Sequence, residues 1–149
     1  MIFDEFLLLT FKRYVPHGKL LIMGGEGSNE DRDWLVERGY ECVIEPKAVF
    51  KFPSQTFDGF VCKAGFVFSS PEWLGYTLRS LKRIVKPHGT GIVMGTYVKN
   101  DDARKKEDVW FNVMTEEGFQ CIDGFYDMRE YYSGKPDYVI RRSYFLKIL

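Results

Sequence analysis

The residues best suited to binding chemistry form a glycine-rich loop, Gly24-Gly25-Glu26-Gly27, that directly follows a short apolar run at 20–23. Glycine lets the backbone approach a ligand closely, and a helix that begins after such a loop offers unpaired N–H groups. Glu45 follows twenty residues after Gly25, at the end of a second apolar run at 42–44. A carboxylate there can accept hydrogen bonds from two ribose hydroxyls. Together these features indicate a ligand that contains adenosine.

A dinucleotide fits this loop less well than a ligand without phosphate. The dinucleotide fingerprint needs a glycine at position 30, where the chain has Glu30. Glu26 and Asp31 add negative charge, and a pyrophosphate would be repelled there. A sulfonium ligand with an amino-acid tail tolerates these acids better. The alternative that the glycines only bend the chain stays open, since many turns use glycine in that way.

Apolar runs alternate with amphipathic segments, and this alternation predicts a parallel sheet covered by helices on both faces. Strands are expected at 20–23, 42–44, 60–62 and 91–94, with a brief one around 49–50. Helices are expected at 3–14, at 28–38, from Ser70 down to Pro87, and at 101–117. Two last strands, 119–126 and 138–149, have no helix between them, so we expect them to pair antiparallel at one edge.

The fold class that follows is α/β, with a single domain over residues 1–149. We expect a doubly wound three-layer sandwich with a mostly parallel sheet and an antiparallel terminal strand pair. The expected strand order is 49–50, 42–44, 20–23, 60–62 and 91–94, with the terminal pair beside the last of these. In such a sheet, ligands bind beyond the carboxyl ends of the strands.

Four segments, in order, resemble class I S-adenosylmethionine-dependent methyltransferases. Residues 21–27 resemble their glycine-rich first motif, 52–62 the segment that leads into their fourth strand, 78–94 their proline-glycine turn and fifth strand, and 116–119 the start of their sixth strand. The resemblance covers roughly residues 18–149. It implies a Rossmann-like fold, S-adenosylmethionine as cofactor, and transfer of its methyl group by in-line displacement.

The resemblance also implies which residues surround the cofactor: Gly24, Gly25, Gly27, Glu45, Cys62, Lys63 and Ala64. Methyl transfer needs mainly the positioning of two reactants, so no protein nucleophile is required and no catalytic residue is predicted. The methyl acceptor is not predicted either.

Departures from the family pattern leave a second interpretation open. Met23 stands where the first motif usually carries an acid, and His88 replaces a glycine of the proline-glycine turn. Only eleven residues separate Glu45 from Phe57, which is too few for a helical crossover plus a strand. The alternative is a catalytically inactive methyltransferase-like protein that serves as a binding or scaffolding subunit.

Charge and cysteine usage argue against several other classes. Lysine plus arginine equals aspartate plus glutamate at 21 each, so there is no strong signal for nucleic acid or for an anionic membrane. No apolar run approaches the length of a membrane span. Cys42, Cys62 and Cys121 lack metal-ligand spacing, so we expect no metal site, free thiols and a cytoplasmic location. Both a homo-oligomer and a partner subunit stay open.

Two groups of charged residues are interpreted as structural. Asp58 starts a strand, so a structural cap is favoured over a catalyst. Four cations near the end of the third helix are expected to form a solvated helix end: Arg79, Lys82, Arg83 and Lys86.

Overall fold

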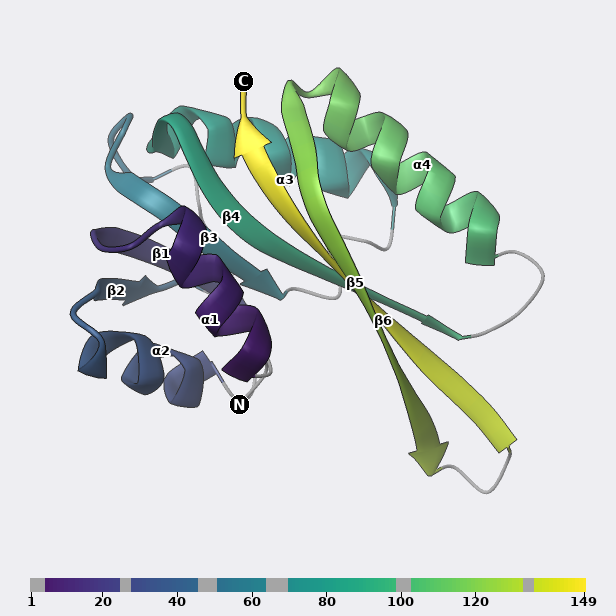
Figure 1. Ribbon diagram of the computed structural model, residues 1–149. Coiled ribbons are helices and arrows are strands. Elements are labelled where there is room, and N and C mark those ends of the chain that lie inside the picture. Colours follow the sequence, from purple (N-terminus) through teal and green to yellow (C-terminus); the bar gives the residue numbers. More distant parts are fainter. Residues whose placement is uncertain (1–4, 25–27, 46–50, 64–69, 99–102, 133–135) are drawn as a thin grey trace.

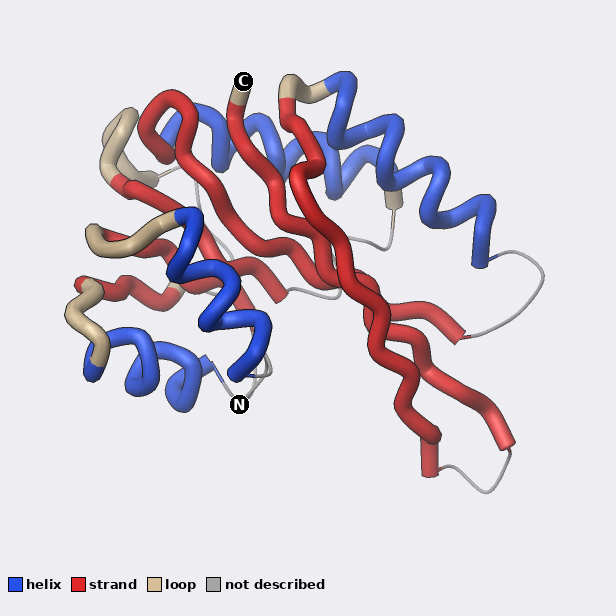
Figure 2. Tube along the Cα trace, viewed as in Figure 1, coloured by secondary structure: helices blue, strands red, loops and turns tan. Residues whose placement is uncertain are grey.

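Six strands form one mixed sheet in the described part of this computed structural model, and four helices pack against it (Figures 1 and 2). The structure describes residues 5–24, 28–45, 51–63, 70–98, 103–132 and 136–149, with backbone only at 96–98, 103–104, 126–132 and 136–141. In chain order the elements are α1 (Glu5–Tyr14), β1 (Lys19–Gly24), α2 (Ser28–Glu37), β2 (Glu41–Ile44), β3 (Phe57–Lys63), α3 (Pro71–Ile84), β4 (Val85–Val98), α4 (Ala103–Glu116), β5 (Phe119–Tyr132) and β6 (Pro136–Ile148).

The strand order is β2-β1-β3-β4-β6-β5. Strands β1, β2, β3 and β4 pair in parallel, and β6 runs antiparallel to both of its neighbours. This confirms the expected order of the strands that the structure describes, and it shows that β6, not β5, pairs with β4. The brief strand expected around 49–50 lies outside the described residues.

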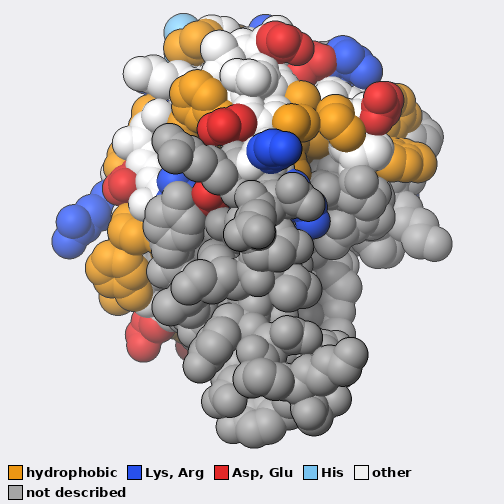
Figure 3. All heavy atoms as spheres, turned by 90° about the vertical axis from the view of Figure 1, so that its right-hand side faces the viewer, with side chains coloured by type: hydrophobic (Ala, Val, Ile, Leu, Met, Phe, Trp, Pro, Cys, Tyr) orange, Lys and Arg blue, Asp and Glu red, His pale blue; other side chains and the backbone are white. Residues whose placement is uncertain are grey.

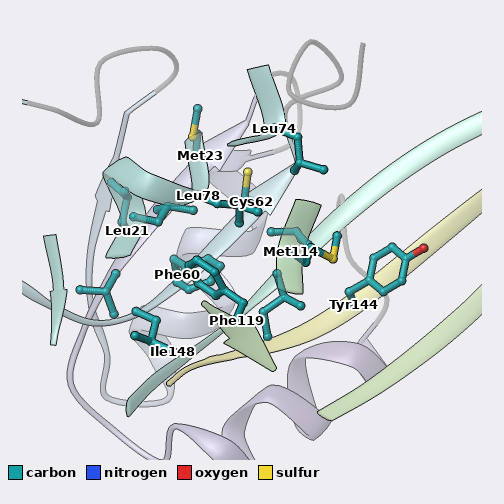
Figure 4. Close-up of a cluster of buried hydrophobic side chains, with 14 of the residues drawn as sticks. Leu21, Met23, Phe60, Cys62, Leu74, Leu78, Met114, Phe119, Tyr144 and Ile148 are labelled. Carbon is teal, nitrogen blue, oxygen red and sulfur yellow. The ribbon is translucent and has the colours of Figure 1, made fainter. Parts of the chain in front are cut away.

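Helices cover both faces of the sheet, and each face has its own apolar cluster. Helices α1 and α2 pack on one face, where the buried side chains include Leu8, Phe11 and Leu35. Helices α3 and α4 pack on the other, where Figure 4 shows Phe60, Leu78 and other side chains in contact. Continuous apolar strands such as β1 follow from this double coverage, because their side chains are buried on both sides.

The boundary between α3 and β4 differs from the prediction. The helix ends at Ile84 rather than at Pro87, because a proline disfavours helical geometry in the residues just before it. Strand β4 therefore begins at Val85, which pairs with Phe57. The register then shifts before Gly59 pairs with Thr90, so the proline-glycine turn lies inside the strand.

The terminal strand pair is longer than predicted. Strands β5 and β6 stay paired from Phe119 and Ile148 to Tyr132 and Pro136. Pairing of β6 with β4 reaches only to Val139, so the two strands continue as a ribbon beyond the sheet (Figure 1). Antiparallel partners satisfy each other's backbone groups along their whole length, so they need no third strand to continue.

The four cations near the end of α3 are exposed to solvent, as expected, and they also bond to other segments. Arg79 forms an ion pair of 2.7 Å with Glu117 after α4, and Arg83 Nη1 donates to the carbonyl oxygen of Phe52 at 2.7 Å. The Phe52 ring also meets the ring of Phe57 edge-on at 5.1 Å. Helix α3 therefore fixes the short segment 51–56 that leads into β3.

No helix in the described residues has the length and apolar character needed to cross a membrane. Figure 3 shows one end of the molecule, where the described acidic and basic side chains are interspersed with hydrophobic ones. The described residues of this end therefore carry charge of both signs.

Candidate functional site

The carboxyl ends of β1 and β3 lie side by side and meet tightly. Gly24 pairs with Lys63 across the two strands. A Cβ atom at Gly24 would lie 2.8 Å from the Lys63 carbonyl oxygen and 3.1 Å from Ser28 Oγ. Because a real Cβ does not approach backbone oxygen so closely, only glycine fits here. Gly24 is therefore required by its contact with Lys63 and Ser28, which the loop motif in the sequence did not predict.

Glu45 lies at the same edge of the sheet, directly after β2. Its backbone N–H donates to the Ile22 carbonyl oxygen at 2.9 Å, which extends the β1–β2 ladder by one bond. Its carboxylate is 14% exposed and forms an ion pair of 2.5 Å with Lys51. Adjacent strands lie about 4.8 Å apart, so Glu45, Gly24 and Lys63 share an edge roughly 10 Å wide.

Helix α2 begins at this edge and places polar side chains under it. Ser28 and Asp31 are both buried, and Asp31 is fully inaccessible to solvent. The spacing S-x-x-D is a helix-start signature, so the sequence contained a signal for this arrangement. Their burial anchors the start of the helix beside the end of β1.

The structure describes four of the seven predicted cofactor residues. Gly24, Glu45 and Lys63 come together as expected, whereas Gly25, Gly27 and Ala64 lie outside the described residues. The side chain of Cys62 is fully buried and points into the apolar cluster beneath α3 and α4 (Figure 4).

Lys51 is the residue that sequence reasoning missed. It lies in the stretch without a clear periodic pattern, and its ammonium reaches back to Glu45 across an intervening stretch of five residues. A lysine a few residues after a strand-ending acid was the available signal, but its direction depends on where Phe52 docks.

Asp58 lies at the opposite, amino edge of the sheet and has a structural role, as expected. Its carboxylate accepts a hydrogen bond of 2.8 Å from the Lys19 backbone N–H and one of 2.9 Å from the Lys86 ammonium. Burial by itself raises the pKa of Asp58, but the bonds from Lys86 and Lys19 outweigh it and hold the pKa below its ordinary value. This carboxylate ties the starts of β1, β3 and β4 together.

The three cysteines are free thiols, as expected. Burial is the main cause that raises the pKa of Cys42 to about 11, so this thiol stays protonated at neutral pH. Burial also raises the pKa of Cys121. Among the described residues, no group of three His, Cys, Asp or Glu side chains could hold a metal ion.

A groove of 280 Å³ lies elsewhere, between α3 and α4, and Gly75 and Val113 are among the residues that line it. The Arg79–Glu117 ion pair lies along this groove. None of the four described cofactor candidates lines it, so it is separate from the edge formed by Gly24, Glu45 and Lys63.

No protein-family model matches the sequence, and no curated protein matches it. Solved structures, in contrast, match the fold. A SAM-dependent methyltransferase from Methanosarcina mazei has a TM-score of 0.63 and 13% identity, over 88% of this chain and 92% of that one. The 1,6-didemethyltoxoflavin-N1-methyltransferase of Burkholderia thailandensis, solved with 1,6-didemethyltoxoflavin and S-adenosylhomocysteine, has a TM-score of 0.66 and 12% identity, over 95% and 76%.

A third match, the DszA carbon methyltransferase, has a TM-score of 0.60 and 17% identity, over 95% of this chain and 51% of that one. The names of the second and third proteins indicate methylation at nitrogen and at carbon, so this fold alone does not identify an acceptor. Each of these three matches covers 88% or more of this chain. The chain therefore has the fold of the class I S-adenosylmethionine-dependent methyltransferases.

Proposed function

We propose that this protein binds S-adenosylmethionine at the carboxyl ends of β1, β2 and β3 and transfers its methyl group to an acceptor. The observation that carries the proposal is the contact at Gly24, which leaves no room for a Cβ beside Lys63 and Ser28. Gly24 ends β1 beside the end of β3, and the carboxylate of Glu45 follows β2 at the same edge. Parallel sheets of this kind bind their ligands at that edge.

The described residues fit this cofactor. Glu45 supplies a carboxylate that can accept hydrogen bonds from two ribose hydroxyls, and its 14% exposure keeps it partly shielded from water. Gly24 has no side chain at the end of β1, so backbone groups rather than a side chain would meet the amino-acid tail there. Bound S-adenosylmethionine would supply a methyl group on a positively charged sulfur.

The protein's part in this reaction is to position and to shield. Cys62 and Lys63 end β3 at the same edge, and the proposal assigns residues 62–64 to the reacting end of the site. Cys62 contributes there through its main chain, because its side chain is buried in the apolar cluster. Lys63 is assigned a place beside the acceptor. Orientation of two reactants supplies much of the rate enhancement in such transfers without a protein nucleophile.

The proposal includes the arrangement that accompanies this fold: one domain, a doubly wound three-layer sandwich and a cytoplasmic location. The acceptor is left open, as are a homo-oligomer and a partner subunit. No role in binding nucleic acid or membrane is proposed.

A catalytically inactive binding or scaffolding protein is the second candidate. The observation that favours it is the short connection between Glu45 and Phe57, together with the ion pair that already engages Glu45. If the helix between the strands of Glu45 and Phe57 is lost and Lys51 neutralises Glu45, the affinity for an adenosine ligand is lower.

Calorimetry with S-adenosylhomocysteine separates the two candidates. We expect wild type to bind, and Glu45→Ala to bind roughly tenfold to a hundredfold more weakly, because it loses charge-assisted hydrogen bonds of about 1.5–3 kcal/mol. Glu41→Ala is the matched control, because Glu41 begins the same strand and is 74% exposed. If wild type shows no binding at millimolar ligand, the scaffold role replaces the enzyme.

A further inference from the structure

Glu45 and Lys51 form the shortest ion pair at the proposed cofactor edge that the structure describes. Lys51 Nζ lies 2.5 Å from Glu45 Oε2, and the lysine side chain is 57% exposed. The carboxylate that the proposed function assigns to the ribose hydroxyls is thus engaged by a cation from the protein itself.

The position of Lys51 is held by its neighbour. The carbonyl oxygen of Phe52 accepts a hydrogen bond from Arg83, and the Phe52 ring packs edge-on against Phe57. The Lys51 ammonium lies 5.7 Å from the centre of the Phe52 ring. The contacts of Phe52 therefore hold Lys51 close to Glu45, the acid that follows β2.

Binding chemistry makes the ammonium and the ribose competitors. Two ribose hydroxyls that donate to one carboxylate need lone pairs on its oxygens, and the ammonium already occupies Oε2. An ion pair with an exposed lysine is weak, so a ligand can displace it at little cost. Only molecules in which Glu45 is not paired with Lys51 can bind the ribose, so the apparent affinity for the ligand is reduced in proportion to their fraction.

We propose that Lys51 acts as an electrostatic latch on the adenosine site: it neutralises Glu45 in the empty protein and leaves it when the ribose binds. The latch rests on the proposed function, because it concerns the same carboxylate and the same ligand. It sets the affinity for the cofactor and makes this affinity depend on salt.

Calorimetry of S-adenosylhomocysteine with Lys51→Met tests the latch. At about 20 mM salt we expect the variant to bind about threefold more tightly than wild type, and at about 0.5 M salt we expect the difference to disappear, because salt screens the pair. Lys19→Met is the matched control. Lys19 of β1 pairs with Glu41 of β2 at 4.0 Å, at the opposite edge of the sheet, and its removal leaves ligand affinity unchanged.

Amine acylation followed by mass spectrometry gives a second measurement. If Lys51 leaves Glu45 on binding, saturating S-adenosylhomocysteine raises the acylation rate of Lys51 relative to Lys19 in wild type. Protection of Lys51 by the ligand would mean that it contacts the ligand directly, and this result overturns the latch.

The binding results also separate failure of the latch from failure of the proposed function. If wild type binds and Lys51→Met binds equally well or more weakly at low salt, the latch is wrong and the adenosine site stands. If wild type, Lys51→Met and Lys19→Met all fail to bind at millimolar ligand, the proposed function fails and the latch falls with it.

Discussion

Two lysine-paired carboxylates lie at opposite edges of the same sheet and differ in what holds them. Asp58, at the amino edge, accepts bonds from the Lys19 backbone N–H and from Lys86. Glu45, at the carboxyl edge, is paired with Lys51, a residue of a turn. A backbone donor in a strand cannot leave without breaking the sheet, whereas a lysine side chain can exchange its partner. Asp58 is therefore committed to the fold, whereas the proposed function assigns Glu45 to a ligand.

The largest expected effect tests how tightly the Asp58 edge is packed. Gly18 has a φ of +127°, and a Cβ there would overlap the Asp58 carboxylate. Gly39 also has a positive φ, +95°, but no atom lies within 4 Å of where its Cβ would be. We expect Gly18→Ala to lower the free energy of unfolding by about 3 kcal/mol and Gly39→Ala by about 1 kcal/mol. Urea denaturation measures both, and equal losses would show that Asp58 moves aside at no cost.

Removal of Asp58 should mainly lower stability, whereas removal of Glu45 should mainly lower ligand affinity. We expect Asp58→Ala to lower the free energy of unfolding by about 2 kcal/mol, because it leaves a strand N–H without its acceptor, and Glu45→Ala by about 0.5 kcal/mol. Affinity for S-adenosylhomocysteine should fall in Glu45→Ala alone. Denaturation and calorimetry on the same preparations check the contrast. A stability loss in Glu45→Ala as large as in Asp58→Ala would show that both acids are structural.

Lowering the pH should destabilise the amino edge around Asp58, by less than removal of the Asp58 side chain does. The pKa of Asp58 is held below its ordinary value in the folded protein, so the unfolded chain binds the proton more readily. The contribution of Asp58 to stability is therefore complete above its pKa in the unfolded chain, which is about 4. It is lost as the pH falls through its lower pKa in the folded protein. We expect the free energy of unfolding to fall more steeply in wild type than in Asp58→Asn between about pH 5 and about pH 3. Parallel curves for the two proteins would contradict this.

The smallest expected effect concerns the lysine partners. Lys86 and Lys51 are 53% and 57% exposed, so solvent screens both pairs. We expect Lys86→Met and Lys51→Met each to lower the free energy of unfolding by about 0.5 kcal/mol or less. Thermal denaturation should then rank the two variants together, while only Lys51→Met changes ligand affinity. A large loss in Lys51→Met would assign Lys51 to the fold and weaken the contrast between the edges.

Much of the core sheet could be predicted from the sequence. Continuous apolar runs bounded by glycine or proline predicted β1, β2, β3 and part of β4. Strands β1 and β3 lie inside the sheet and are largely buried on both faces, which requires such runs. The segment 85–90 could not be predicted in this way. Its proline ended the helix early, and a register shift then placed the proline-glycine turn inside β4.

The candidate site was predicted to a similar extent. Spacing alone placed Gly24 and Glu45 at neighbouring strand ends, since successive parallel strands end at the same edge. Spacing did not give the direction of the Cys62 side chain, which depends on the pleat of β3 and on which face α3 covers. The sequence therefore predicted that Cys62 and Lys63 end a strand, but not that the Cys62 side chain turns into the core.

The sequence by itself determined the local order of the elements: a glycine after the first apolar run, an acid after the second, and the alternation of apolar runs and amphipathic segments that orders the strands. Tertiary structure decided which charges meet. Asp58 lies 39 residues from Lys19 and 28 from Lys86, and only the strand register brings them together. Lys51 is close to Glu45 in sequence, but its turn is directed by the packing of Phe52 against the core. Local patterns fix backbone conformation, whereas ion pairs depend on where the completed core leaves each side chain.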